Sequence, residues 1–173
     1  MTAYFHVYTG DGKGKTTAAL GTVLRSVGHG NRALIIQFLK ERSETGELAA
    51  CKFLPGVEIV QMGRGFPPKE DDARFAEHRH AAVEALEFAL EALASGTCDL
   101  LVLDEICGAI AKKLIEEDRV IALLKRPTTV SCIILTGRDA SPSLMEQADT
   151  VTEMVCIRHA WQSGVQSQEG VEY

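Results

Sequence analysis

The sequence predicts an α/β fold in which a single doubly wound, mostly parallel sheet carries helices on both faces. Short apolar runs alternate with longer segments in which apolar residues recur every three or four positions, the pattern of strands alternating with helices. A glycine-rich stretch separates the first strand from the first helix. The 173 residues have the length of one domain, so we expect one domain over residues 1–173.

The first strand, the glycine-rich loop and the first helix predict a phosphate-binding site. Residues 4–8 are mostly aromatic or β-branched, and residues 9–14 contain three glycines. Glycines let backbone N–H groups converge on one anion, and the amino end of a helix adds its positive dipole. In Gly14-Lys15-Thr16 the lysine offers an ammonium to phosphate oxygens, and the threonine offers a hydroxyl to Mg²⁺. We therefore predict a nucleotide triphosphate site in a P-loop NTPase-like fold.

The loop departs from the pattern G-x-x-x-x-G-K-[ST] at its first glycine. Thr9 stands where that glycine belongs, and the glycine follows at Gly10, so we expect an altered mouth of the loop. A flexible turn that happens to contain a lysine is the alternative interpretation. That alternative is the weaker one, because the loop has three glycines, Lys13, Lys15 and a threonine pair and lies between a strand and a helix.

The next elements follow from periodicity. Residues 15–27 carry an apolar stripe, and Gly28-His29-Gly30 ends that helix. Residues 33–38 form a continuous apolar run, typical of a strand covered on both sides. We expect a third strand at 57–62, a loop at 63–68, and a long helix at 69–94 that Ser95-Gly96 ends.

The fourth strand is expected at 98–105 and ends in two acids, Asp104 and Glu105. A carboxylate at this position beside a phosphate loop is where a Walker B acid holds Mg²⁺, directly or through water. An acidic helix cap would give the same local pattern. The Gly-Lys-Thr sequence upstream favours the metal-binding interpretation, with Thr16, Asp104 and Glu105 as the candidate ligands.

The rest of the chain completes the alternation. We expect helices at 106–117, 119–124 and 143–148, and strands at 130–136 and 150–158. Ligands on such sheets bind outside the carboxyl ends of the strands. The segments expected to converge there are 10–16, 39–47, 63–68, 104–105 and 137–138.

Composition excludes several classes of function. Acidic residues outnumber basic ones by 24 to 18, and the basic residues form no run with interleaved aromatics, so nucleic acid is a poor candidate partner. No apolar run approaches the length of a membrane span, and the first strand begins too close to Met1 for a signal peptide. The five cysteines contain no C-x-x-C pair and are interpreted as reduced packing residues. We expect a cytoplasmic protein that binds no membrane.

A wider set of positions carries a family resemblance. It comprises Tyr8 to Ala19, Arg25, Gly28-His29-Gly30, Gln37-Phe38, Gly65-Phe66, Leu103-Asp104-Glu105, Thr136-Gly137-Arg138, Ala148-Asp149, Arg158-His159-Ala160 and Glu169 to Tyr173. With these residues the chain resembles the ATP:corrinoid adenosyltransferases of the P-loop type, from the first strand to the last residue.

The resemblance implies transfer of the 5′-deoxyadenosyl group of ATP to the Co(I) centre of a corrinoid, with release of triphosphate, in adenosylcobalamin biosynthesis or salvage. The phosphates are then the leaving group, so the site must neutralise charge on the departing oxygen and aim C5′ at cobalt. The family is understood to bind ATP in the reverse sense across the loop, which agrees with the shifted glycine.

The resemblance also implies roles for individual residues. Lys15, Thr16 and Glu105 are the catalytic candidates, with Mg²⁺, or Mn²⁺ in its place, held by Thr16, Glu105 and Asp104. Arg25 is carried over as a contact to a terminal phosphate, although a surface arginine near a helix carboxyl end would look the same. The residues expected to bind the nucleotide or the corrin are Thr9, Gly10, Asp11, Gly12, Lys13, Gly14, Lys15, Thr16, Thr17, Arg25 and Phe66.

Three departures from the family are visible. Phe66 stands where a phenylalanine packs on the lower face of the corrin, but Pro68 replaces the tryptophan of better-known members. Asp11 replaces an asparagine beside the phosphates. The chain starts at its first strand, without an N-terminal helical extension, so we expect an open site or one closed by a partner subunit.

The resemblance implies further partners and leaves alternatives open. A flavoprotein electron donor and a homodimer are expected, and the acceptor is cobalamin, cobinamide or an earlier cobyrinic acid intermediate. A P-loop ATPase or nucleotide kinase would use the same loop, Lys15, Thr16 and Glu105. A non-catalytic ATP-sensing module would bind ATP without turnover.

Overall fold

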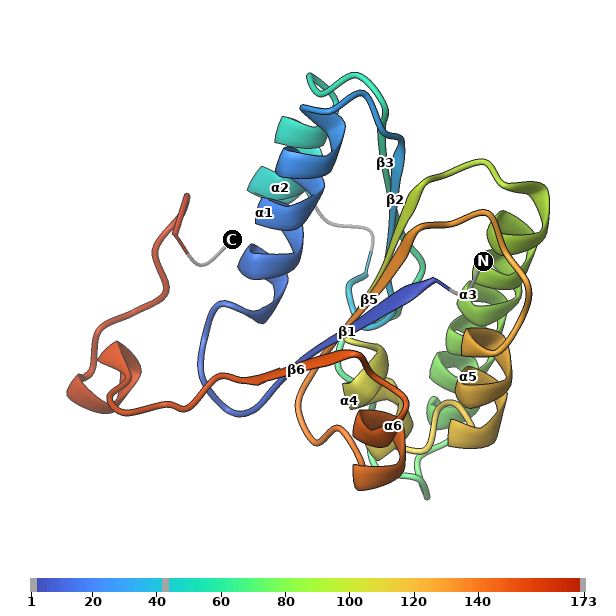
Figure 1. The fold of residues 1–173 in the computed structure, drawn as a ribbon. Helices are drawn as coiled ribbons and strands as arrows, with labels where there is room; N and C mark the ends of the chain where they lie inside the picture. Colours follow the sequence, from blue (N-terminus) through green and yellow to red (C-terminus); the bar gives the residue numbers. More distant parts are fainter. Residues whose placement is uncertain (1–2, 42–43, 172–173) are drawn as a thin grey trace.

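Six strands of the described part of the chain form one sheet, and every neighbouring pair in it is parallel (Figure 1). The computed structural model describes residues 3–41 and 44–171. The strand order is β3-β2-β4-β5-β1-β6. The predicted α/β class is confirmed, and the sheet is parallel throughout rather than mostly so. The strands are β1 (Tyr4–Thr9), β2 (Ala33–Gln37), β3 (Val57–Gln61), β4 (Leu100–Asp104), β5 (Cys132–Thr136) and β6 (Thr150–Glu153).

Helices cover both faces of the sheet, as predicted. On one face α1 (Lys15–Val27) and α2 (Gly46–Cys51) pack over a cluster that contains Ala19, Val23 and Ile35. The other face carries the larger core, in which the long helix α3 supplies Ala82, Leu86 and further residues (Figure 1). The helices there are α3 (Phe75–Ser95), α4 (Ile106–Ala111), α5 (Glu117–Leu124) and α6 (Pro142–Glu146), and a 3₁₀ turn, η1 (Ala160–Ser163), follows β6.

Strand β2 shows why a continuous apolar run was required. Leu34 and Ile36 belong to the cluster under α3, whereas Ala33 and Ile35 belong to the cluster under α1. Successive side chains of a strand point to opposite faces, so a strand between two helical layers has no solvent-facing position. All five residues of β2 are buried.

Several predicted boundaries were wrong. The long helix starts at Phe75 rather than near residue 69, because Asp72 accepts a hydrogen bond from the backbone N–H of Arg74 (2.8 Å) and holds a turn there. The predicted helix 106–117 ends at Ala111, and Lys113 turns into the left-handed region at φ 58°. Helix α2 was not predicted.

The last strand is also shorter than predicted, because β6 ends at Glu153 rather than near residue 158. Its partner β1 ends at Thr9, where the chain turns into the glycine-rich loop. After β6 the chain leaves the sheet and returns towards α1 (Figure 1). Two parts of the predictions, residues 42–43 of the 39–47 loop and Glu172 and Tyr173 of the family resemblance, lie outside the described residues.

Within the described ranges, no helix is long and apolar enough to cross a membrane. The five cysteines are free, and Cys51, Cys98 and Cys107 are buried. Burial raises the pKa of the Cys98 thiol to about 11 and that of the Cys107 thiol to about 12. Thiols held in this protonated form are poor nucleophiles, in agreement with their interpretation as packing residues.

Asp99 ties three strands together at the amino edge of the sheet, opposite the loops. Its carboxylate accepts hydrogen bonds from the backbone N–H (2.8 Å) and Nε (3.3 Å) of Arg32, and its carbonyl accepts from Ser131 N–H (2.8 Å). These bonds from Arg32 lower the pKa of the Asp99 carboxyl.

Asp99→Ala is expected to lower the free energy of unfolding at pH 7 by about 1 kcal/mol, since a partly exposed hydrogen-bonded carboxylate is lost. Because the folded pKa is depressed, this contribution is complete above the ordinary aspartate pKa and disappears as the pH falls through the folded value. Thermal unfolding of both proteins at neutral and acidic pH measures it. A changed affinity of this variant for a nucleotide triphosphate would contradict the separation of the two edges.

Candidate functional site

A cavity of about 570 Å³ lies at the carboxyl ends of the strands, the edge where the sequence predicts convergence. The predicted site residues that line it are Asp11, Gly12, Lys13, Gly14, Lys15, Thr16, Thr17, Phe66 and Glu105. Thr9, Gly10, Asp104 and Arg25 do not line it. Its size falls in the range of pockets for one small ligand.

Lys15 lies at the start of α1 and closes the loop in this structure. Its ammonium donates hydrogen bonds to the carbonyls of Gly10 (2.7 Å) and Gly12 (2.7 Å). Burial lowers the pKa of Lys15 below its ordinary value, while the charge of Glu105 opposes that shift. The loop therefore places a largely buried ammonium at the amino end of a helix, where an anion binds well.

The glycines of the loop are required by the segment that follows β6. Met154 accepts a hydrogen bond from Gly12 N–H (2.6 Å) and donates one to the Thr9 carbonyl (2.8 Å). A Cβ on Gly10 would lie 2.5 Å from the Met154 carbonyl oxygen, and one on Gly12 would lie 2.6 Å from it. The position of Gly10, with φ 91°, is thus explained by the neighbouring chain.

Thr9 has a different environment from the glycine that the common loop pattern places there. It is 7% exposed, and its hydroxyl accepts a hydrogen bond from the N–H of Ala140 (3.2 Å). The side chain thus links the loop to the segment after β5. Thr9 therefore anchors the start of the loop through Ala140 and does not line the cavity.

Gly10→Ala is expected to abolish ATP binding, because the new methyl group would overlap the Met154 backbone and the left-handed φ disfavours alanine. The affinity for ATP measures the effect, and circular dichroism checks the fold. Gly21→Ala is the matched control, since a Cβ at Gly21 meets nothing within 4 Å. Equal ATP affinity in the two variants would contradict this account of the loop.

Asp104 is the most constrained acid of the site. It is fully buried, and both of its carboxylate oxygens accept hydrogen bonds. Oδ1 accepts from the hydroxyls of Thr16 (2.8 Å) and Thr136 (2.7 Å), and Oδ2 accepts from the Gln37 amide (3.0 Å). Thr16 donates its one hydroxyl proton to Asp104, so only oxygen lone pairs remain for the cavity that Thr16 lines.

Glu105 follows directly and lines the cavity. Its backbone is left-handed at φ 64°, and its N–H donates to the Thr136 hydroxyl (2.9 Å). Burial raises the pKa of the Glu105 carboxyl, with Asp104 adding to the shift and Lys15 opposing it. A further positive charge beside Glu105, in addition to that of Lys15, would favour the ionised carboxylate and lower this pKa again.

The oxygen donors fit a hard divalent cation. Thr16 and Glu105 present a hydroxyl oxygen and a carboxylate to the cavity, and Asp104 orients the hydroxyl. Mg²⁺ is usually held by one or two carboxylates together with substrate phosphates and waters. Among the described residues no group of three or more His, Cys, Asp or Glu side chains forms a metal site, so phosphate oxygens would have to complete this one.

Phe66 lies in the loop after β3 and lines the same cavity, although it is 83% exposed. The loop is anchored at Gly63, where a Cβ would lie 2.4 Å from the Phe38 carbonyl oxygen. A ligand that fills the cavity would therefore contact this side chain.

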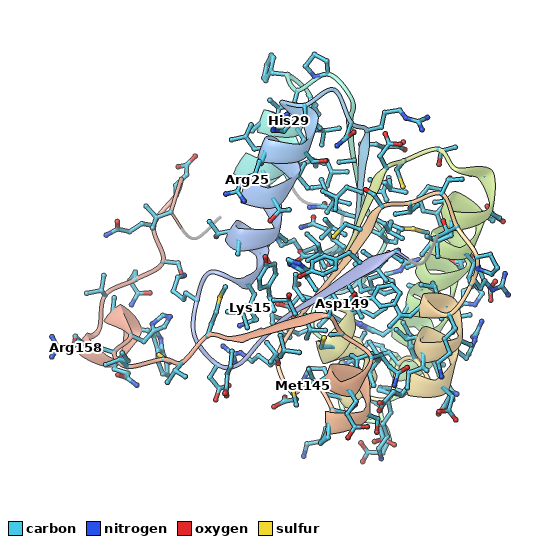
Figure 2. All side chains as sticks on the ribbon, viewed as in Figure 1. Lys15, Arg25, His29, Met145, Asp149 and Arg158 are labelled. Carbon is cyan, nitrogen blue, oxygen red and sulfur yellow. The ribbon has the colours of Figure 1, made fainter. Side chains whose placement is uncertain are left out.

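Arg25 lies farther along α1 than Lys15 and is exposed (Figure 2). Three cations that were not assigned as site residues line the cavity instead: Lys40, Lys112 and Arg138. Lys40 forms an ion pair with Glu47, and Nε of Arg138 lies 3.9 Å from Oδ1 of Asp11. The position of residues 137–138 at the sheet edge was predicted, but Arg138 was not assigned as a site residue. Its positive charge at that edge is the sequence feature from which a phosphate contact could have been inferred.

A strand, a glycine-rich loop with Lys15 and Thr16 at the start of a helix, and a buried acid at the end of β4 define a P-loop NTPase-like protein. The flagellar accessory protein FlaH of Methanocaldococcus jannaschii has a similar fold, with a TM-score of 0.57 over 88% of this chain and 70% of that one, at 14% identity.

Sequence comparison defines the family. The family model described as ATP:corrinoid adenosyltransferase BtuR/CobO/CobP matches residues 1–173. The chain is 38% identical to the corrinoid adenosyltransferase of Pseudomonas aeruginosa, over 96% of this chain and 82% of that protein. It is 35% identical to that of Escherichia coli, over 96% and 84%. The chain belongs to the ATP:corrinoid adenosyltransferase family and is an enzyme of that class.

Proposed function

We propose that the chain transfers the 5′-deoxyadenosyl group of ATP to the Co(I) centre of a corrinoid and releases triphosphate, in adenosylcobalamin biosynthesis or salvage. The observation that supports this reaction is the shared cavity: the phosphate loop and the exposed Phe66 line the same space. A nucleotide held by the loop therefore has an apolar surface beside it for a macrocycle.

The residues of the cavity suit a reaction in which triphosphate departs. A cobalt–carbon bond forms at C5′, and the bond from C5′ to the triphosphate oxygen breaks with its electron pair on that oxygen. Lys13, Lys15 and Arg138 line the cavity and can neutralise the new negative charge. Fixed cations in a partly desolvated site stabilise such charge more than water does. The backbone N–H groups of the loop add to this effect.

Thr16 and Glu105 would hold Mg²⁺, or Mn²⁺ in its place, and Asp104 would act through Thr16. The ion would supply positive charge next to the phosphate oxygens. Glu105 is half-buried, and the charge of the ion would add to that of Lys15 and Arg138 in balancing its carboxylate.

The corrinoid is expected to lie across the mouth of the cavity. A volume of about 570 Å³ suits one nucleotide, and a macrocycle stacked on that nucleotide would cover the exposed side chain of Phe66. Phe66 is proposed to pack on the lower face of the corrin and expel the lower axial ligand. Pro68 offers a smaller apolar surface than a tryptophan.

Further partners belong to the same proposal. A flavoprotein electron donor would reduce cobalt before the transfer, and a homodimer in the cytoplasm is the expected form of the enzyme. Arg25 and Thr17 are kept as proposed nucleotide contacts, Arg25 only if the end of the triphosphate reaches along α1.

The proposal is tested anaerobically with ATP, Mg²⁺, a cobalamin and a strong reductant. We expect the absorbance of a cobalt–carbon product to appear together with one equivalent of intact triphosphate. Accumulation of orthophosphate or of a phosphorylated product would favour the ATPase or kinase alternative. ATP binding with no turnover of the reduced cobalamin would favour the sensing module.

A further inference from the structure

Two glutamines connect the end of β3, which the Phe66 loop follows, to Asp104 at the end of β4. Gln61 ends β3, Gln37 ends β2 and Asp104 ends β4, and the three stand in register across the neighbouring strands. Gln61 Nε2 donates to Gln37 Oε1 (3.1 Å), and Gln37 Nε2 donates to Asp104 Oδ2 (3.0 Å). Gln37 is 1% exposed, so its amide is fixed by these partners.

The two bonds give this chain one direction. Gln37 turns its NH₂ group towards Asp104 and its carbonyl towards Gln61, and Gln61 presents its own NH₂ group to that carbonyl. Consecutive bonds of this kind polarise one another in a buried setting, so a change in the bonds at Asp104 alters the bond between Gln37 and Gln61.

The same three strand ends are joined through the backbone. Phe38 N–H donates to the Asp104 carbonyl (3.0 Å), and Met62 N–H donates to the Gln37 carbonyl (3.1 Å). Gly63 packs directly on the Phe38 carbonyl, where a Cβ would lie 2.4 Å from its oxygen. The loop that carries Phe66 therefore begins at a fixed point on the strand next to Asp104.

We propose that Gln37 and Gln61 are positioning residues that couple nucleotide binding at Thr16 and Asp104 to the placement of the Phe66 loop. This inference rests on the proposed function, since it takes a corrinoid as the ligand of that loop. A cation of the bound nucleotide, held on the lone pairs of the Thr16 hydroxyl, polarises the hydrogen bond that this hydroxyl donates to Asp104. That change passes through Gln37 and Gln61 to the first residues of the loop.

The test compares the affinity for hydroxocobalamin with and without saturating Mg-ATP, in the absence of reductant, so that no transfer occurs. For the unchanged chain we expect at least about fivefold tighter binding with Mg-ATP, a usual size for coupled sites. We call the affinity for hydroxocobalamin with Mg-ATP divided by that without it the coupling ratio. Gln61→Met keeps the bond from Gln37 to Asp104, so the affinity of this variant for Mg-ATP should stay within about twofold while the coupling ratio falls towards one. Gln37→Met should lower both the ratio and the affinity for Mg-ATP.

Gln147→Met, at the end of α6, is the control and should keep the full ratio. If Gln37→Met does not fold, Gln61→Met decides, because Gln61 is only half-buried. A ratio near one in the unchanged chain, or a full ratio in Gln61→Met, would overturn the inference. A full ratio without any cobalt–carbon product on adding reductant would instead contradict the proposed function and leave the coupling intact.

Discussion

Replacing Lys15 with alanine should lower kcat/KM for adenosyl transfer at least about 10²–10³-fold, the usual loss when one preorganised group that stabilises developing charge is removed. Lys15 is the cation whose ammonium contacts the loop carbonyls of Gly10 and Gly12. With ATP bound, it is expected to leave them for the phosphates. Formation of the cobalt–carbon product under anaerobic conditions measures the loss.

Two further variants make the test specific. Lys125→Ala removes an exposed lysine at the end of α5 and should retain full activity. Lys15→Arg keeps the charge but should not restore transfer, because a planar guanidinium is bulkier than an ammonium and bonds differently. Full activity in Lys15→Ala, with an unchanged KM for ATP, would show that the loop does not hold the triphosphate.

The elements around the glycine-rich loop could be predicted well because their signal is local. Strand, loop and helix are consecutive in the chain, and the start and end of α1 at Lys15 and Val27 agree with the prediction. Asp104 was identified because it ends an apolar run. The apolar periodicity of the sheet and its helices also fixed the fold class.

The contacts that complete the site are not local and could not be predicted. Glycine is required at position 10 because of the backbone of Met154, which lies 144 residues later in the sequence (154 − 10). Gln37 and Thr136 bind Asp104 from two other strands, and only the strand order brings them together. Helix ends were misplaced for a related reason: Ala111 is followed by Lys112 and Lys113, good helix formers whose local preference continues past the observed end.

The largest effect on the corrin side is expected for Phe66→Ala, and it should depend on the oxidation state in which cobalt is supplied. When Co(II) must be reduced on the enzyme, we expect a loss of about 10–100-fold, the effect of removing 1.5–3 kcal/mol of aromatic burial. When Co(I) is supplied ready-made, the loss should be several-fold smaller, because expulsion of the lower axial ligand is no longer required. Rates of product formation in the two assays measure the difference.

Phe53→Ala is the matched control for this prediction. Phe53 is 84% exposed and Phe66 is 83% exposed, but only Phe66 lines the cavity. Neither side chain packs in the core, so both variants should unfold at the temperature of the unchanged chain, and a loss of activity in Phe66→Ala cannot be attributed to folding. Equal losses in the Co(II) and Co(I) assays would refute the role of Phe66 in reduction, because a residue that only binds the corrin would affect both assays alike.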